Sequence, residues 1–234
     1  MTIPWLAPDQ PFPPVDQALV SPNGLLAAGA DLSVARLLAA YRRGIFPWFS
    51  EGDPVLWWSP DPRMVLRVDQ LRVSRSLARL MRRGHWRVTA DTAFDAVVGA
   101  CAAPRGGAPG TWILPEMREA YGRLARQGAA HSVEVWEADE LAGGLYGVAV
   151  GRMFFGESMF SRRSSASKVA LAALVAQLAR WEFELVDCQM STPHLASLGA
   201  EEIPRAEFLA HVAQLVARPG VPGPWAFEAA EAPV

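Results

Sequence analysis

The chain has 234 residues, a formal net charge of −2 and 51% hydrophobic residues. This length and composition suffice for a full hydrophobic core, and the slightly acidic balance argues against broad, charge-driven binding of nucleic acid. The two cysteines, Cys101 and Cys188, fall inside expected core elements, which indicates free thiols in a reducing compartment and excludes a zinc site.

Nothing in the sequence is typical of a membrane or secreted protein. No apolar run reaches the roughly 18 residues that a transmembrane helix requires, and the N-terminus lacks the basic start and apolar stretch of a signal peptide. We therefore expect a cytoplasmic protein without membrane contact.

The N-terminal region is rich in proline and tryptophan. A short helix is expected over 34–41, and three tryptophans follow it among loops and short strands. We expect Trp57 and Trp58 in a small aromatic core and Trp48, which lies in a turn, against a ligand. Near residue 67 the segment rich in proline and tryptophan gives way to regular helices. This change in composition predicts a small N-terminal α/β domain over 1–67 and a second domain over 68–234.

The first helix of the second domain is expected over 74–83 and has an apolar face and a basic face. Its basic face could engage a phosphate backbone or could be an ordinary solvated surface. The arginines on that face are Arg75, Arg79, Arg82 and Arg83.

Strands and helices follow in a defined order. After a strand at 86–88 and two helices, the sequence predicts three strands, a helix, a strand and a last helix, at 132–136, 141–150, 153–157, 168–179, 185–189 and 205–217. This order matches that of GNAT-type acyltransferases. The predicted fold class is therefore α+β, with a GNAT-like domain whose mixed, mostly antiparallel sheet is flanked by helices.

Two acidic residues lie where neighbouring strands are expected to end. Glu157 ends one strand, Asp187 lies near the end of the strand after the next helix, and a right-handed crossover brings such strand ends together. Alternation places Asp187 and Gln189 on one face and Cys188 on the other. Because a carboxylate in an apolar strand costs free energy unless it is satisfied, Asp187 is either functional or a structural hydrogen-bond acceptor.

The sequence contains no phosphate-binding loop of the G-x-x-x-x-G-K type. The protein is therefore not expected to activate a substrate with ATP, and its donor must arrive already activated. Lys168 is the single lysine of the chain, and apart from the histidines all other basic side chains are arginines.

Several longer motifs carry a resemblance to one family. The chain resembles the leucyl/phenylalanyl-tRNA–protein transferases over nearly its whole length. The shared motifs are PNGLL at 22–26, YRRGIFPWF at 41–49, LWWSPDPR at 56–63, TWI at 111–113, HSVEVW at 131–136, GESMFS at 156–161, ASK at 166–168, DCQ at 187–189, and the segment around His194 with SLGA at 197–200 and IPR at 203–205.

This resemblance implies a substrate pair, a mechanism and a set of site residues. The enzyme would transfer Leu or Phe, with Met as a third donor, from aminoacyl-tRNA to the N-terminal Arg or Lys of acceptor proteins, marking them for N-end-rule degradation. It would act without a cofactor or metal, as a monomer. The implied catalytic residues are Asp187, Gln189 and Glu157. Gln189 would accept a hydrogen bond from the attacking amine, and Asp187 would orient it and stabilise the developing ammonium, while either this relay or the 3′-terminal ribose hydroxyl of the tRNA could carry the proton to the leaving oxygen. Glu157 would hold the acceptor or make a buried structural hydrogen bond.

The resemblance also implies binding residues. An apolar aminoacyl pocket would consist of Trp48, Leu145, Phe154, Met159, Leu174 and Val186, and Trp112 and Tyr121 would lie near the terminal adenosine and the pocket rim. Lys168 and the four arginines of the 74–83 helix would contact the tRNA. His194 could shuttle a proton or serve a structural role.

Two positions depart from the family pattern. The family commonly has Asn where this chain has Ser165, and the segment between Gln189 and His194 differs. Ser165 or Ser167 is still expected to cap the following helix.

Two other functions compete with this interpretation. A GNAT-type N-acyltransferase that uses acetyl-CoA has the same layout, but the loop at 162–167 lacks the glycines with which such enzymes hold pyrophosphate. A non-catalytic RNA-binding module could use the arginine face and the tryptophans, but the acidic balance and the cluster of Glu157, Asp187 and Gln189 argue against it.

Overall fold

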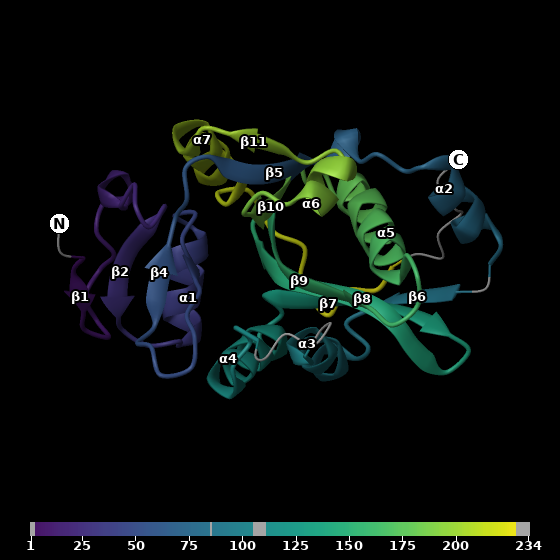
Figure 1. Ribbon diagram of the computed structural model, residues 1–234, viewed down its shortest axis with the longest axis horizontal. Coiled ribbons are helices and arrows are strands. Elements are labelled where there is room, and N and C mark those ends of the chain that lie inside the picture. Colours follow the sequence, from purple (N-terminus) through teal and green to yellow (C-terminus); the bar gives the residue numbers. More distant parts are fainter. Residues whose placement is uncertain (1–2, 85, 105–110, 228–234) are drawn as a thin grey trace.

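The computed structural model describes residues 3–84, 86–104 and 111–227. Within them the chain forms two sheets, a small one near the N-terminus and a larger one that dominates the molecule (Figure 1). None of the helices in these residues combines the length and hydrophobicity that crossing a bilayer requires.

The small sheet has four strands in the order β1-β2-β4-β3. Helix α1 packs beside it and begins after Ser33, whose side chain accepts a hydrogen bond from the Arg36 amide. Trp57 is fully buried, as predicted, and donates its indole N–H to the carbonyl oxygen of Gly29. The elements are β1 (Trp5–Leu6), a 3₁₀ turn (Val15–Gln17), β2 (Leu25–Gly29), α1 (Val34–Tyr41), β3 (Phe46–Pro47) and β4 (Leu56–Trp58).

The large sheet has seven strands in the order β11-β5-β10-β9-β8-β7-β6. Its neighbours run antiparallel except β9 and β10, which are parallel. The strands are β5 (Arg63–Arg67), β6 (Trp86–Ala90), β7 (Ala130–Glu137), β8 (Glu140–Val150), β9 (Met153–Ser161), β10 (Leu185–Gln189) and β11 (Glu201–Ile203). The predicted mixed, mostly antiparallel sheet is therefore confirmed.

Helices cover both faces of the large sheet. Helix α5 lies on one face, and α3 and α4 lie on the other (Figure 1). The helices are α2 (Arg75–Arg82), α3 (Phe94–Ala102), α4 (Pro115–Arg126), α5 (Ala166–Arg180), α6 (Pro193–Ser197) and α7 (Arg205–Leu215). This arrangement confirms the predicted α+β class, and the predicted elements occur in the expected order, with the short α6 and β11 as additions between β10 and α7.

Two structural features bear on the predicted limit between the two domains. Strand β5 precedes the expected boundary at residue 67, yet it pairs with β10 and β11 of the large sheet. Sheet pairing thus changes between Trp58 and Arg63, and the ranges 1–67 and 68–234 remain predictions as domain limits. One hydrophobic core also joins the two parts, because side chains of α1, such as Leu37 and Tyr41, belong to the same buried cluster as those of α4.

Ser165 is the N-cap residue of α5, as predicted, but its side chain makes no cap hydrogen bond. Instead the Ser161 hydroxyl oxygen accepts a hydrogen bond from the Ser167 backbone N–H at 2.9 Å. Ser165 has φ of 70° and therefore lies in the left-handed region, which explains why its side chain does not reach the first turn.

Candidate active site

The site lies where the parallel strands β9 and β10 stop pairing. The last paired residues are Phe155 and Asp187. On β9, Gly156 opposes Gly147 and Ser158 opposes Tyr146, so Glu157 is the extra residue of a β-bulge. Bulges redirect side chains and are frequent next to active sites. The bulge thus removes Glu157 from the regular ladder and turns it toward the space between the strands.

Strand β10 has a matching irregularity. Against β5, Asp187 opposes Val65 and Gln189 opposes Met64, which leaves Cys188 as an extra residue, and Gln189 has a left-handed φ of 62°. Both strands therefore leave regular geometry at the same level.

An apolar cavity of about 250 Å³ opens between the two strands. Five of the six residues predicted for the aminoacyl pocket line it, namely Leu145, Phe154, Met159, Leu174 and Val186. Glu157, Asp187 and His194 also lie in its wall. The cavity therefore combines an apolar interior with acidic groups, as a site for an apolar side chain beside an amine requires.

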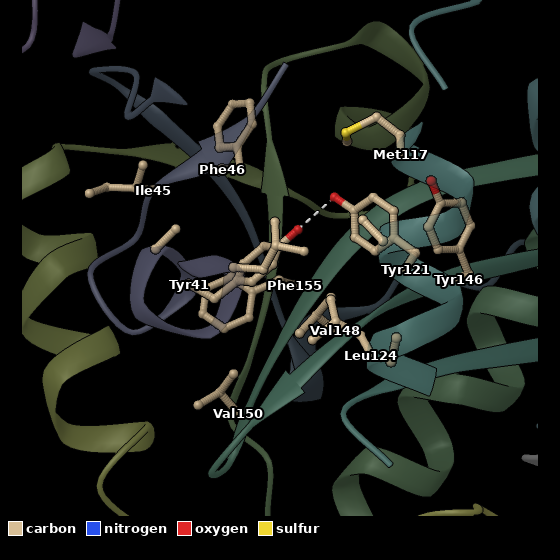
Figure 2. Close-up of a cluster of buried hydrophobic side chains, with 14 of the residues drawn as sticks. Tyr41, Ile45, Phe46, Met117, Tyr121, Leu124, Tyr146, Val148, Val150 and Phe155 are labelled. Atoms are coloured by element: carbon tan, nitrogen blue, oxygen red, sulfur yellow. Dashed lines mark hydrogen bonds between the residues drawn. The ribbon is translucent and has the colours of Figure 1, made fainter. Parts of the chain in front are cut away.

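Glu157 is the centre of a compact hydrogen-bond cluster. The Tyr41 hydroxyl lies 2.7 Å from its Oε1, the Tyr121 hydroxyl lies 2.7 Å from its Oε2, and the side-chain amide of Gln189 donates to Oε1 at 3.1 Å. The two tyrosine hydroxyls are themselves 2.7 Å apart. Figure 2 shows Tyr41 and Tyr121 pointing toward one another, with a dashed line joining their oxygens.

Burial dominates the electrostatics of this cluster. Burial raises the pKa of Glu157 and the nearby Asp187 adds to the rise, while the two tyrosine hydroxyls and Arg63 lower it, and together they bring the pKa to about 8. Burial also raises the pKa of both tyrosines well above 10, so their hydroxyls stay protonated. The cluster therefore favours a neutral carboxyl at neutral pH.

Asp187 has a different environment from the one expected. Its two oxygens accept hydrogen bonds from Nε and Nη2 of Arg63 at 2.8 and 2.6 Å, and both side chains are buried. One of these oxygens also accepts the backbone N–H of Gln189 at 2.9 Å. Asp187 thus orients Gln189 through its backbone, and its charge is matched by Arg63.

Arg63 is itself clamped between aromatic rings. Its guanidinium lies 4.8 Å from the ring centre of Phe46 and 4.5 Å from that of Phe208, distances typical of cation–π contacts. Its Nη1 has no hydrogen-bond partner within the described residues. The rings of β3 and α7 therefore fix the arginine that fixes Asp187.

The aromatic residues predicted for the pocket mouth occupy different positions. Trp48 is 36% exposed, and its ring lies 5.4 Å from that of Trp58. Trp112 is partly buried against the core, and neither tryptophan lines the cavity. Tyr121 is fully buried and its hydroxyl is hydrogen-bonded to Glu157. It therefore positions the carboxyl and does not form part of an exposed pocket rim.

A second cavity, of about 350 Å³, adjoins the first. The two cavities share Met159 and His194, and Ser161, Arg162 and Ser167 give the second a more polar wall. Partial burial and the neighbouring Lys168 lower the pKa of His194. His194 is therefore neutral near pH 7 and sits between the cavities.

The arginines predicted to contact tRNA lie apart from both cavities. Arg75, Arg79 and Arg82 are exposed on α2 and Arg83 follows the helix, whereas Leu77 on the opposite face is buried. Lys168 lies in the first turn of α5, close to His194.

Comparison with known proteins identifies the family. The family model described as leucyl/phenylalanyl-tRNA protein transferase matches residues 65–213, and the model of the N-terminal domain of the same family matches residues 30–61. The chain belongs to the leucyl/phenylalanyl-tRNA–protein transferase family. The resemblance seen in the sequence is thereby confirmed.

Relatives named leucyl/phenylalanyl-tRNA–protein transferase match almost end to end. The protein of Thiobacillus denitrificans is 61% identical over 93% of this chain and 95% of its own length. Those of Nitrosospira multiformis and Aromatoleum aromaticum are both 60% identical, over 92% and 97% of this chain and 92% and 96% of theirs. This chain is accordingly an aminoacyltransferase.

Solved structures show weaker likeness. L-PGS from Bacillus licheniformis has a TM-score of 0.40 and 8% identity over 71% of this chain and 53% of that one. A GCN5-related N-acetyltransferase from Kribbella flavida has a TM-score of 0.36 and 13% identity over 72% and 60%.

Sequence reasoning missed two members of this transferase site. Arg63 and Tyr41 both lie inside motifs that carry the family resemblance, YRRGIFPWF and LWWSPDPR, yet no role was assigned to either. The sequence offered two signals: Arg63 follows two nearby prolines, and Tyr41 lies at the end of an amphipathic helix. Neither signal identifies the residue that each side chain contacts, because those partners are distant in the sequence.

Proposed function

We propose that this transferase moves Leu or Phe, with Met as a third donor, from aminoacyl-tRNA to the N-terminal Arg or Lys of acceptor proteins, which are thereby marked for N-end-rule degradation. The observation that carries this proposal is the apolar cavity with Glu157 in its wall, where Glu157 accepts a hydrogen bond from the side-chain amide of Gln189.

The cavity suits a large, unbranched or γ-branched side chain. Its lining by Leu, Phe, Met and Val side chains offers dispersion contacts without a specific hydrogen bond. One methylene changes binding in such a pocket by only roughly 1 to 3 kcal/mol. A graded preference among Leu, Phe and Met follows, with Leu145, Phe154, Met159, Leu174 and Val186 as the contact residues.

The reaction is the attack of an amine on an ester. The C–N bond forms, the bond from the acyl carbon to the ribose oxygen breaks, and the proton lost by the amine ends on that oxygen. About a tenth of an α-amino group is neutral at pH 7, and well-oriented reactants reach effective molarities on the order of 10⁵ to 10⁸ M. The protein therefore needs chiefly to position the amine.

Gln189 is the group that positions it. Its Nε2 donates to Glu157, which turns its carbonyl oxygen toward other donors. An attacking amine can donate to that oxygen, while Asp187 and Arg63 hold the backbone of Gln189 in its left-handed conformation. Glu157 faces the cationic end of the acceptor, for which a carboxylate is the usual partner.

The tRNA would contact surfaces outside the cavity. Trp48 and Trp112 are available to stack near the terminal adenosine, and the exposed arginines of α2, with Lys168, are available to phosphates. The cytoplasmic location, the monomeric state and the lack of a cofactor stay predictions.

The test mixes the protein with radiolabelled Leu-tRNA and a peptide that begins with Arg. Label should enter that peptide, ribonuclease should abolish the transfer, and a peptide beginning with Asp should receive none. Labelling from acetyl-CoA in place of the charged tRNA would instead identify an acetyltransferase and refute the proposal.

A further inference from the structure

Three short contacts join the oxygens of Glu157, Tyr41 and Tyr121. Each measures 2.7 Å: Tyr41 to Oε1, Tyr121 to Oε2, and Tyr41 to Tyr121. We call this arrangement the carboxyl–tyrosine ring. A separation of 2.7 to 2.8 Å is typical of an O–H···O hydrogen bond, in which one proton lies between the two oxygens.

A count of protons decides the charge of the ring. Each tyrosine hydroxyl has one proton to donate, and an ionised carboxylate has none. Two protons cannot fill three contacts, so an ionised Glu157 would leave one pair of electron-rich oxygens 2.7 Å apart with nothing between them. A protonated carboxyl supplies the third proton and closes the ring.

We propose that the empty enzyme holds Glu157 as a neutral carboxylic acid in the carboxyl–tyrosine ring, and that binding of the acceptor's cationic end expels this proton. In the closed ring Oε2 donates to Tyr121, Tyr121 donates to Tyr41, and Tyr41 donates to Oε1. Tyr41 is thus a positioning residue, contributed by α1 to a carboxyl of β9.

The same direction fits the second hydrogen bond of Oε1. The Gln189 amide donates to Oε1 at 3.1 Å, so this oxygen accepts twice and behaves as the carbonyl oxygen of the acid. Within the part of the chain that the structure describes, the hydrogen bond of Oε2 is with Tyr121, and Oε2 is the oxygen that carries the proton. The proton therefore lies on the side of the carboxyl that faces α4.

The surrounding groups do not supply a charge that would reverse this assignment. The groups with electrostatic influence on Glu157 are the two ring tyrosines, Asp187 and Arg63. Arg63 is in a buried ion pair with Asp187, so the two charges largely cancel at Glu157. Tyr146 packs against Tyr121 with ring centres 5.4 Å apart and raises the pKa of both ring tyrosines, which keeps their hydroxyls protonated. The pKa of Glu157, about 8, agrees with the proton count.

The release of the proton on binding rests on the proposed function. A Lys or Arg side chain has a pKa above 10 and keeps its own proton, so a cation that contacts Glu157 stabilises the carboxylate, and the carboxyl proton passes to the buffer. An acceptor without a cation gives no such stabilisation. The ring thus makes the carboxyl ionised only when a cation is present to pair with it.

The first test needs no substrate. Infrared difference spectra of the wild type minus Glu157→Gln at about pH 6.5, where ordinary carboxyls are ionised, should show the carbonyl band of one protonated carboxylic acid. That band should disappear as the pH rises through about 8. Absence of the band at about pH 6.5 overturns the inference, whatever the enzyme's activity.

The second test asks whether Tyr41 donates to the carbonyl oxygen of the acid. Tyr41→Phe removes one hydrogen bond from Oε1, so the carbonyl band of the protonated carboxyl should move to a higher frequency than in the wild type. A band that keeps the wild-type frequency would mean that Tyr41 does not donate to Oε1, and that result would overturn the ring.

The third test measures the proton that leaves. Calorimetric titration with an Arg-initiated peptide in two buffers of different ionisation enthalpy should show release approaching one proton per peptide at about pH 6.5, and Glu157→Gln should release none. Tight binding without proton release overturns the expulsion step. Failure of the wild type to transfer Leu from tRNA would refute the proposed function and leave the infrared result intact.

Discussion

At the scale of single residues, the pair of Arg63 and Asp187 is the interaction on which the site's geometry most depends. Removing one partner of a buried ion pair leaves an uncompensated charge and costs about 3 to 5 kcal/mol of stability. We therefore expect Asp187→Ala to lower the free energy of unfolding by about that amount, and to lower turnover far more than Ser165→Asn does. Urea denaturation and single-turnover transfer measure the two effects.

A double variant distinguishes the roles of charge and position. Arg63→Met with Asp187→Leu removes both buried charges, so most of the lost stability should return. Turnover should stay low, because the backbone N–H of Gln189 has lost the Asp187 carboxylate as its hydrogen-bond acceptor in the double variant too. Wild-type turnover in the double variant would mean that the pair does not position Gln189.

Glu157 gives the protein a characteristic dependence of stability on pH. Its pKa is about 8 in the folded protein against an ordinary value of 4.5, so the native state binds more protons than the unfolded state between these values. Stability therefore falls as pH rises through this window, with a slope of at most about 1.4 kcal/mol per pH unit from this group. Urea denaturation between about pH 5 and 8 should show this slope in the wild type and a weaker one in Glu157→Gln. Parallel profiles would contradict the raised pKa.

At the scale of the elements, the loop before α5 contains a strain that can be removed. Ser165 has φ of 70° and makes no side-chain cap bond, and left-handed geometry is disfavoured for most residues other than Gly, Asn and Asp. Ser165→Asn should raise the free energy of unfolding by about 0.5 to 1 kcal/mol and leave turnover unchanged. Ser165→Ala, which gains no local hydrogen bond, is the matched control. A less stable Asn variant would show that the loop is held by contacts specific to serine.

The strands were predictable from the sequence, but their irregularities were not. Alternating apolar residues identify β9 and β10, and the crossover through α5 correctly brings their ends together. Strict alternation put Cys188 on the face opposite Asp187, whereas both line the cavity, because Cys188 is the extra residue of a bulge. Glu157 is the extra residue of another. A bulge depends on the partner strand's register, which a single strand's sequence does not contain.

At the scale of the whole molecule, the site joins segments that are far apart in the sequence. Tyr41 comes from α1, Arg63 from β5, Tyr121 from α4, Glu157 from β9 and Gln189 from β10. The aminoacyl-pocket residues could be proposed because the family resemblance names their positions, and five of them do share a cavity. The partners of Glu157 and Asp187, Tyr41 and Arg63, could not be predicted in this way. Only tertiary packing brings the N-terminal part of the chain against the large sheet.

The arginines of α2 are predicted to contact the tRNA outside this site. They are exposed on the face of α2 opposite its buried Leu77, and α2 lies at the end of the molecule opposite the small N-terminal sheet (Figure 1). Phosphate contacts of this kind add affinity without touching the reacting ester. Replacing Arg79 and Arg82 with Ala should therefore raise KM for Leu-tRNA several-fold while kcat stays constant.

The salt dependence makes that prediction specific. Each lost phosphate contact should make the slope of log(kcat/KM) against log salt shallower by about 0.7 to 0.9. Arg126→Ala, the loss of an exposed arginine on α4, is the control and should leave both KM and the slope near wild type. Initial rates measured at several salt concentrations decide the matter. An unchanged slope in the Arg79 and Arg82 variant, together with an unchanged KM, would mean that α2 presents an ordinary solvated face and that the tRNA is held elsewhere.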